Sequence, residues 1–382
     1  TIGMNSNLKP ENTSSIEAGF EAAFWDNRLY LDFTYYKTDS RNQILKLATT
    51  AASGYTSQVR NAGHIRNRGY EIQLGAVPIQ TSKGFRWNLD LNYGANSSKV
   101  VKLDDEGLIT SYQLYSSGIQ ILASVGEAYG TLFGTSYVRD ANGNVVVDAN
   151  GLPKISTTNK TLGKFTPDWT GGISNTFSYR SLSLSFLIDA SVGGSIFSNT
   201  NKTGKYTGVL ANTLSGRDAE HGGLWYYTDA MGNNVRLSES PSYSVSSDGL
   251  YYAQVNGQST RVYQDGIMVE GVTESGSKNE EVVSAEKYYH RIYSIAEANV
   301  YDASYVKLRE VALSYRLPRL WTQKLHLQEA SVTLTGRNLW TIYKSVPNID
   351  PESALTTGNA QGVEAYSLPT TRSFGVNLSV KF

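Results

Sequence analysis

The last ten residues of the chain, SFGVNLSVKF, alternate strictly between polar and apolar side chains. Successive side chains of a strand point to opposite faces, so one face of this segment is wholly apolar. About 9 to 11 tilted strand residues are enough to cross the hydrocarbon layer of a membrane. The segment ends on the aromatic Phe382 and is typical of the closing strand of an outer-membrane β-barrel.

The same alternation recurs along the chain and predicts nine strands in all. The other eight are expected at residues 14–25, 28–36, 69–76, 85–93, 168–179, 182–192, 302–316 and 326–340. The apolar positions of 302–316 change parity, which predicts a bulge near Arg309. All nine prolines are expected outside these strands or at their edges, because proline has no N–H to donate to a ladder.

The connections between these strands alternate in length. Short ones are expected near 25–28, 77–84, 179–181 and 317–325, and long ones at about 48–62, 98–167, 195–301 and 341–370. Transmembrane barrels have short periplasmic turns and long outer loops. If Phe382 ends at the periplasm, every short connection is periplasmic and every long one extracellular. A strand at 126–139 would then need a partner within its own loop.

Composition agrees with this fold and excludes others. The 382 residues include 26 Tyr and 35 Gly but only 18% charged residues, and no run of 18 apolar residues predicts a transmembrane helix. The formal net charge of zero gives no attraction for nucleic acid. The chain has no Cys, which excludes disulfides and Cys-based metal sites. A soluble β-sandwich also alternates, but its strands are typically shorter, near 5 to 6 residues.

Few residues suggest chemistry. Asp140, Asn142 and Asn144 resemble the start of a calcium loop, but the twelfth position holds Gly151 rather than a bidentate Glu, which favours a pair of Asn-Gly turns. The four histidines have no metal-binding spacing, and no Gly-x-Ser-x-Gly elbow occurs. We therefore expect neither an enzyme nor a metal or cofactor; an outer-membrane hydrolase with a triad assembled in space is the alternative.

Aromatic residues cluster in the longest predicted loop, 195–301. Exposed aromatic rings can stack on sugars or peptides, and they are also enriched in protein interfaces. The candidate substrate-binding residues are Trp225, Tyr226, Tyr227, Tyr251 and Tyr252. The segment EKYYHRIY, residues 286–293, belongs to the same cluster. Ligand binding, partner binding and packing of the loop's own core all remain open for these side chains.

Five segments in order resemble the C-terminal part of SusC/RagA-type TonB-dependent transporters. They are residues 7–45, 61–74 (NAGHIRNRGYEIQL), 302–318 (DASYVKLREVALSYRLP), 336–352 (GRNLWTIYKSVPNIDPE) and 368–382. Asn338 and the stretch 348–352 match fold-defining turns of the family rather than ligand residues. The resemblance covers nearly the whole chain.

This resemblance implies an all-β, transmembrane antiparallel barrel of 22 strands. The chain, residues 1–382, would supply the C-terminal nine to eleven strands, while the plug and first strands would come from a missing or separate piece. Thr1 is not followed by a signal sequence, which agrees with a mature piece or a fragment. An open sheet edge is not tolerated in lipid, so the remaining strands are expected partners.

The resemblance also implies a function. It is the import of a bulky nutrient, an oligosaccharide or oligopeptide, across the outer membrane, with a SusD-like surface lipoprotein as lid and the TonB complex acting through the missing N-terminal part. Polar residues such as Arg86, Asn88, Asp90 and Asn92 would line the lumen, while the opposite faces contact the lipid bilayer. The alternative is a barrel that imports nothing and serves as an assembly or surface-attachment platform.

Overall fold

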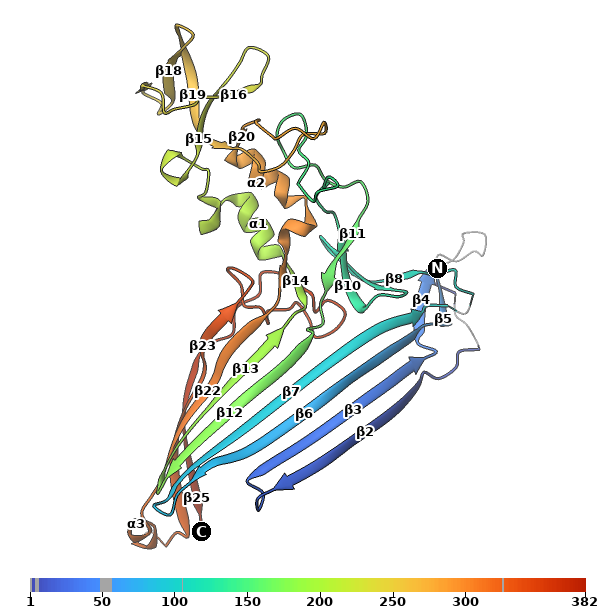
Figure 1. The fold of residues 1–382 in the computed structure, drawn as a ribbon, viewed down its shortest axis with the longest axis vertical. Helices are drawn as coiled ribbons and strands as arrows, with labels where there is room; N and C mark the ends of the chain where they lie inside the picture. The colour runs from blue at the N-terminus through green and yellow to red at the C-terminus, as the bar shows by residue number, and fades with distance from the viewer. Residues whose placement is uncertain (1, 4–6, 49–56, 105, 325) are drawn as a thin grey trace.

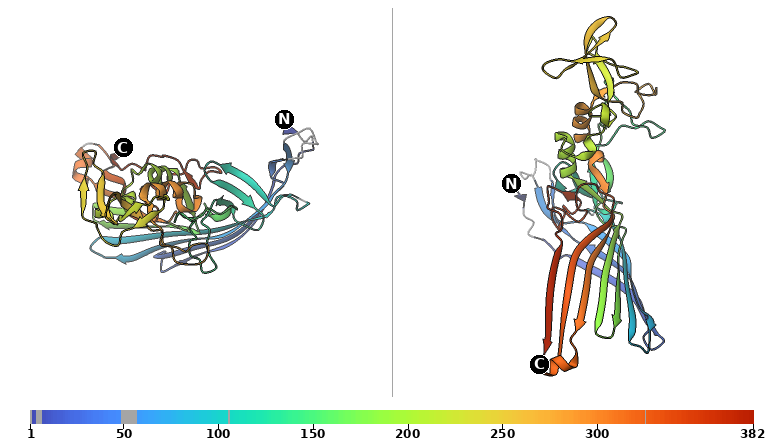
Figure 2. Two further views of the ribbon diagram at one scale, coloured as in Figure 1. Left: turned by 90° about the horizontal axis from the view of Figure 1, so that it is seen from above. Right: turned by 90° about the vertical axis from the view of Figure 1, so that its left-hand side faces the viewer.

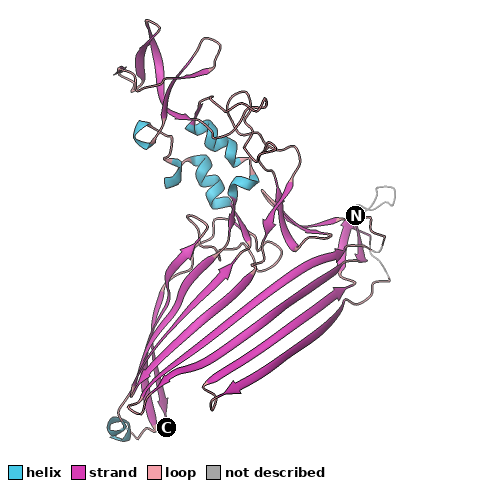
Figure 3. Ribbon diagram, viewed as in Figure 1, coloured by secondary structure: helices cyan, strands magenta, loops and turns pink. Residues whose placement is uncertain are grey.

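In the computed structural model, one large curved β-sheet carries a bundle of loops at one of its ends (Figure 1). Figure 2 shows this sheet as an open wall, with its two edge strands apart. Figure 3 shows that the helices lie almost entirely among the loops. The structure describes residues 2–3, 7–48, 57–104, 106–324 and 326–382.

The large sheet contains the nine predicted strands. Each pairs antiparallel with the wall strand that comes before or after it in the sequence. In that order the strands are β2 (Asn12–Phe24), β3 (Leu29–Arg41), β6 (His64–Gln80), β7 (Phe85–Lys102), β12 (Trp169–Tyr179), β13 (Leu182–Val192), β22 (Tyr305–Arg316), β23 (Glu329–Lys344) and β25 (Ser373–Lys381). The sheet is therefore an up-and-down meander, the topology of a transmembrane barrel wall.

The register gives the wall one apolar and one polar face. A row of paired apolar side chains crosses six strands: Leu31, Leu74, Leu91, Ile173, Ile188 and Leu308. A neighbouring row on the other face reads Asp32, Gln73, Asn92, Gly172, Asp189 and Lys307. A shift of one residue would exchange the faces of a whole strand, so these rows fix the register.

Aromatic rings form two bands on the apolar face. Near the short turns Trp87 stacks on Phe177, with ring centres 5.6 Å apart. Nearer the loops, the ring of Tyr93 lies 5.4 Å from that of Trp169. Six residues separate Trp87 from Tyr93, about 20 Å along a strand. Two aromatic bands flanking an apolar zone are typical of a barrel wall at the two interfaces of a membrane.

Two irregularities concern residues singled out in the sequence. The register of β22 shifts between Leu308 and Glu310, which confirms the predicted bulge at Arg309. The prediction that every proline lies outside the strands or at their edges is wrong for Pro78, which lies inside β6 (His64–Gln80). The ladder shifts between Ala76 and Ile79, so this proline has no partner and its missing N–H is not needed.

Several strands extend beyond the apolar alternation. Strand β6 begins at His64 rather than 69, and β7 continues to Lys102 rather than 93, because their ends nearest the long loops pair through polar residues such as Asn67 with Ser98. The ladder thus continues past the apolar zone, and the second long loop begins later than predicted. Strand β23 begins at Glu329, so Leu327 lies outside it.

The alternation of connection lengths is confirmed. The short connections and Phe382 lie at one end of the wall, and the long loops lie at the other (Figure 1). One short connection holds the helix α3 (Arg319–Lys324). In the first long loop, β4 (Ile44–Ala48) and β5 (Ser57–Asn61) pair with each other and β5 with β1 (Ile2–Gly3), while residues 49–56 lie outside the described part.

The second long loop forms a sheet of its own. Its four strands are β8 (Ser111–Ser116), β9 (Gln120–Ser124), β10 (Tyr129–Gly134) and β11 (Lys160–Lys164). The strand expected within 126–139 is β10, and its partners are β9 and β11 rather than the wall. The second loop thus supplies the partner that the predicted topology required.

The third long loop begins and ends between two neighbouring wall strands, where Ser191 of β13 lies opposite Tyr305 of β22. Its elements are β14 (Ser195–Ser198), α1 (Asn199–Thr207), η2 (Ala211–Thr213), η3 (Ala219–His221), β15 (Leu224–Thr228), β16 (Asn234–Arg236), β17 (Tyr243–Val245), β18 (Tyr251–Val255), β19 (Gln258–Ile267), β20 (Val283–Ser284), α2 (Ala285–Tyr293), η4 (Ala296–Asn299) and β21 (Val300–Asp302). Strands β15 to β20 form a six-stranded sheet at the far tip of the molecule (Figure 1).

A buried core joins the long loops rather than the wall. Ile121 and Leu132 of the second loop pack with Phe197 of the third and with Val363 of β24 (Val363–Glu364) in the fourth. Strand β24 also pairs with β14. In the described part of the chain, no helix is both long and apolar enough to cross a membrane.

Candidate ligand-binding site

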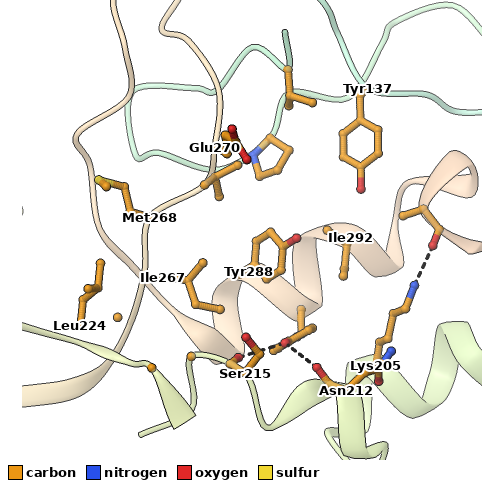
Figure 4. Close-up of a pocket in the computed structure, with 18 residues that line it drawn as sticks. Tyr137, Lys205, Asn212, Ser215, Leu224, Ile267, Met268, Glu270, Tyr288 and Ile292 are labelled. Atoms are coloured by element: carbon orange, nitrogen blue, oxygen red, sulfur yellow. Dashed lines mark hydrogen bonds between the residues drawn. The ribbon is translucent and has the colours of Figure 1, made fainter. Parts of the chain in front are cut away.

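A cavity of about 710 Å³ lies within the bundle of long loops. Helices α1 and α2 and strand β19 surround it, together with the hairpins of the second loop (Figure 4). Aliphatic side chains form much of its wall, including Leu224, Ile267, Met268 and Ile292. Its size falls in the range of ordinary ligand pockets, about 300–1,000 Å³.

Local capping holds α1 in place beside the cavity. The Ser198 hydroxyl accepts a hydrogen bond from the Asn201 amide at 3.0 Å and so caps the helix. The fully buried Glu364 accepts from the hydroxyls of Ser198 at 2.7 Å and Thr200 at 2.6 Å. Gly208 ends the helix in the left-handed conformation. The start of α1 is therefore fixed to the fourth loop.

Lys205 of α1 supplies the buried charge of the cavity. The residue is 8% exposed, and its ammonium donates to the Ala298 carbonyl at 2.6 Å and to Asn299 Oδ1 at 3.3 Å. Among the described residues it has no carboxylate partner. Burial lowers the pKa of Lys205 to about 8, because an unpaired charge is poorly solvated there.

Phenol groups line the same cavity as this ammonium or lie near it. Tyr137 and Tyr288 line the cavity, and burial raises the pKa of both. The Lys205 nitrogen lies 5.3 Å from the ring centre of Tyr301, whose hydroxyl is buried without a hydrogen-bond partner. Burial raises the pKa of Tyr301 to about 12. All three phenols therefore stay protonated at neutral pH and can donate hydrogen bonds.

The five aromatic residues predicted from sequence lie in the six-stranded sheet beyond the cavity. Trp225 and Tyr226 of β15 are buried, at 8% and 4% exposure. Trp225 packs against Tyr251 at 5.8 Å between ring centres, and the Tyr226 hydroxyl donates to Asp265 at 3.2 Å. Tyr227, Tyr251 and Tyr252 are partly exposed. None of the five lines the cavity, although Leu224, next to Trp225, does.

Of the aromatic residues singled out in the sequence, two of those in the segment 286–293 line the cavity. Its Tyr288 and Tyr289 lie on α2, and the Tyr289 hydroxyl donates to the carbonyls of Asn212 at 3.1 Å and Ser215 at 3.0 Å. The segment NKTGKYTG around Lys205 carries no comparable pattern, so this lysine was missed. Asn299, which buries it, lies 94 residues further along the chain.

The predicted turns at Asp140 and after it are confirmed. Its carboxylate accepts from the backbone amides of Asn142 at 2.9 Å and Asn144 at 2.8 Å, and from the Asn144 side chain at 3.0 Å. These hydrogen bonds lower the pKa of Asp140, with the Asn144 side chain the largest cause. No cluster of three metal-ligating side chains occurs in the described ranges.

A second polar cluster ties the fourth loop to the polar face of the wall. The ammonium of Lys307 on β22 contacts Asp350 at 2.6 Å and Glu352 at 2.5 Å. Arg309 bridges Asp189 of β13, at 2.6 Å, and Glu352. Burial would raise the pKa of Asp350, but hydrogen bonds from Lys307 and Thr370 outweigh it and hold that pKa at about 2.

A meandering wall with an apolar aromatic face, short turns at one end and large loops at the other defines the class of outer-membrane β-barrels. Residues 1–207, more than half of the chain, match the family described as TonB dependent receptor-like, beta-barrel, and the chain belongs to this family. It is thus an outer-membrane protein that crosses the membrane with strands. Receptors of this family are transporters rather than enzymes.

Known relatives agree with this assignment. TonB-dependent receptor P3 of Formosa agariphila is 27% identical over 99% of this chain and 35% of that receptor. Receptor P26 of the same species is 25% identical with the same coverage. The RagAB peptide transporter has a TM-score of 0.61 at 20% identity, over 97% of this chain and 35% of that one. The chain spans about a third of the length of these proteins.

The likeness to RagAB confirms, at the level of the fold, the predicted resemblance to SusC/RagA-type transporters. The RagAB peptide importer in its "open-open" state gives a TM-score of 0.63 at 18% identity, over 99% of this chain and 35% of that one. Similarity of this degree establishes the architecture of the wall and leaves its ligand to be argued from the residues.

Proposed function

We propose that the chain supplies the later wall strands and the outer loops of a TonB-dependent importer for a bulky nutrient, an oligosaccharide or an oligopeptide. The open nine-stranded wall carries this proposal, because a sheet with two free edges is not stable in lipid and has to be completed by further strands. Residues 1–382 would then be the C-terminal part of the barrel, and other residues would supply the plug and the TonB contact.

A SusD-like surface lipoprotein is the proposed lid over the outer loops. Support comes from the fold-level likeness to RagAB, which has been solved in "open-open" and "closed-closed" states. Lid closure would trap the nutrient above the plug, and traction by TonB would then remodel the plug. The cargo would pass along the polar face of the wall. Arg86, Asn88, Asp90 and Asn92 of β7 lie on that face, each opposite a residue of β12, as Asn92 lies opposite Gly172.

The five aromatic residues of the distal sheet remain proposed contacts with cargo or lid. Tyr227, Tyr251 and Tyr252 have accessible ring surface for this role. Trp225 and Tyr226 would act by supporting the sheet, since both are buried within it. Aromatic rings placed in this way supply contact area with little loss of side-chain entropy.

Uptake in cells tests the transport proposal. Deletion of the gene is expected to abolish uptake of one class of labelled oligosaccharide or oligopeptide, and the intact gene is expected to restore it. A matched strain lacking the lipoprotein lid is expected to lose most uptake of the same class. Unchanged uptake of every oligosaccharide and oligopeptide after gene deletion would refute import and favour an attachment platform.

A further inference from the structure

We propose that the cavity in the outer loops binds a short peptide with free termini, its carboxylate directed to Lys205 and its amino group held at Glu270. The inference rests on the proposed import function for its purpose, because the site would hold cargo on the outer side of the wall. Its chemistry rests on three observations: an unpaired buried cation, an unpaired acid at the opposite side, and several apolar side chains in the same cavity wall.

The unpaired cation points to an anionic ligand group. Lys205 is more than nine-tenths buried, yet its only hydrogen-bond acceptors in the described part of the chain are the neutral Ala298 carbonyl and the Asn299 amide. Neutral dipoles compensate a buried charge less well than an anion does. A ligand carboxylate would complete the coordination of this ammonium.

Unused hydrogen-bond donors occur in the same cavity. The hydroxyls of Tyr137 and Tyr288 have no hydrogen-bond partner in the described ranges, and both point toward the Lys205 side of the cavity (Figure 4). The buried hydroxyl of Tyr301, whose ring lies near the ammonium, has none either. An ammonium with neighbouring phenol donors suits a carboxylate, which accepts several hydrogen bonds at once.

Two arginines near the cavity do not offer an alternative anion site, because each already has a carboxylate. Arg139 pairs with Glu297 at 2.8 Å, and Arg291 pairs with Asp148 at 3.0 Å. Lys205 is thus the cation of the cavity wall that lacks an ion pair in the part of the chain the structure describes.

An acid lies across the cavity from this cation. Glu270 is exposed, lines the same cavity and has no ion pair among the described residues. Figure 4 shows Glu270 and Lys205 on opposite sides of the site. A zwitterion with separated termini matches this arrangement, because each terminus meets the opposite charge. The amino group would remain near solvent, where Glu270 lies.

The apolar part of the cavity wall favours a peptide over a sugar. It includes Ile267, Met268, Val269 and Ile292, which offer no side-chain hydrogen bonds. Sugar hydroxyls buried against such a wall would lose their hydrogen bonds to water, whereas apolar peptide side chains would gain from burial. An acidic sugar would match Lys205 alone, without the apolar wall or Glu270.

Calorimetric titration of the purified full-length receptor tests the proposal. The probe is alanyl-leucyl-alanine, compared with its C-terminal amide and with its N-acetyl form. The free acid is expected to bind about tenfold or more tightly than the amide, as a charge-assisted hydrogen bond implies. Lys205→Met is expected to abolish this preference. Lys202→Met, on the same helix but outside the cavity wall, is the matched control and is expected to retain it.

A second variant keeps the test decisive if Lys205→Met misfolds. Glu270 is exposed, so Glu270→Gln leaves the packing intact and is expected to weaken binding of the free-amine peptide several-fold, with no effect on the N-acetyl peptide. Equal binding of acid and amide, tighter binding of glucuronic acid than of the peptide, or no binding at millimolar peptide would each overturn the inference.

These outcomes are independent of the transport test. Absence of peptide binding together with gene-dependent uptake of a nutrient would overturn the peptide site and leave import standing. The opposite result would be peptide binding that the Lys205 and Glu270 variants weaken as expected, together with nutrient uptake that does not depend on the gene. That result would overturn import and leave the site standing.

Discussion

At the scale of single residues, the protonation of Lys205 gives a pH dependence. Burial lowers its pKa to about 8, so the protonated fraction falls from about nine-tenths at pH 7 to about one-tenth at pH 9. The groups facing it are Asn299, Tyr137, Tyr288 and Tyr301, and burial raises the pKa of the three phenols, which keep their protons over this range.

Affinity for the N-acetyl peptide is therefore expected to fall about tenfold between pH 7 and pH 9. The acetyl group removes the titration of the peptide's own amine. Calorimetry at the two pH values measures the change, and Lys205→Met is expected to show a flat profile. An unchanged affinity of the unmodified receptor at pH 9 would contradict a role for the ammonium.

Lys307 gives a second prediction, on the anchoring of the fourth loop. Lys307→Met leaves the buried carboxylate of Asp350 without a cation, while Glu352 keeps Arg309, at an expected cost of about 3–5 kcal/mol. Limited proteolysis of residues 345–372 is expected to accelerate. The exposed pair Arg316 and Glu329 supplies the control, because Arg316→Gln is expected to change stability by less than about 1 kcal/mol.

The ion pair between Lys307 and Asp350, which anchors the fourth loop, is also expected to persist in mild acid. The pKa of Asp350 falls from its ordinary 3.8 to about 2, so its contribution is complete above pH 4 and is lost only as the pH falls toward 2. Proteolysis of the fourth loop in unmodified receptor at pH 4 and pH 7, with an acid-tolerant protease, is expected to give the same pattern. Release of the loop at pH 4 would contradict the assigned pairing.

The residues of the cavity could be read from the sequence only in part. Tyr288 and Tyr289 belong to a visible aromatic cluster, whereas Lys205 looks like an ordinary surface lysine until η4 returns to cover it. Trp225 and Tyr226 were found as aromatic residues, but their burial follows from the pairing of β15 with β19, which alternation over five residues does not specify. Burial depends on contacts between residues that are far apart in the sequence, so the spacing of residue types along the chain does not predict it.

At the scale of elements, the wall strands were predictable and the loop elements were not. All nine wall strands alternate with a two-residue period over a membrane-spanning length. Lipid requires apolar side chains on one face, and the lumen requires polar side chains on the other. Helices α1 and α2 are nine residues each and depend on caps at Ser198 and Ser284 and on packing across loops. Such short helices are marginal alone, so sequence periodicity predicts them poorly.

Gly69 of β6 gives a prediction at this scale. It is buried beneath Tyr36, whose hydroxyl donates to Asn96 at 3.2 Å, and a methyl group at Gly69 would overlap the Tyr36 ring and the Ala95 carbonyl. Gly69→Ala is therefore expected to destabilise the wall by about 1–3 kcal/mol. Thermal unfolding of the purified receptor in detergent measures the change.

Gly94 on the next strand provides the matched control. A methyl group there would meet only Thr170 Oγ1, at 4.0 Å. Gly94→Ala is expected to unfold within a few degrees of the unmodified receptor. Equal loss of stability in both variants would show that close contact with Tyr36 is not the reason for glycine at position 69.

At the scale of the whole molecule, the two free edges decide whether the wall can stand alone. Within the residues that the structure describes, strands β2 and β25 pair on one side only, so each presents a row of unpaired backbone groups. Residues 1–382 produced by themselves are expected to aggregate in detergent rather than give a heat-modifiable barrel. Electrophoresis with and without boiling measures this, and the full-length receptor, expected to shift on boiling, is the control.

The third loop leaves the wall at β13 and returns at β22, and Ser191 and Tyr305 lie opposite each other at its base. Any segment whose ends are a single strand spacing apart could therefore replace it by recombination without disturbing the ladder on either side. The membrane-spanning frame and the loop can thus be altered separately at this junction, because the pairing of β13 with β22 does not depend on what the loop contains.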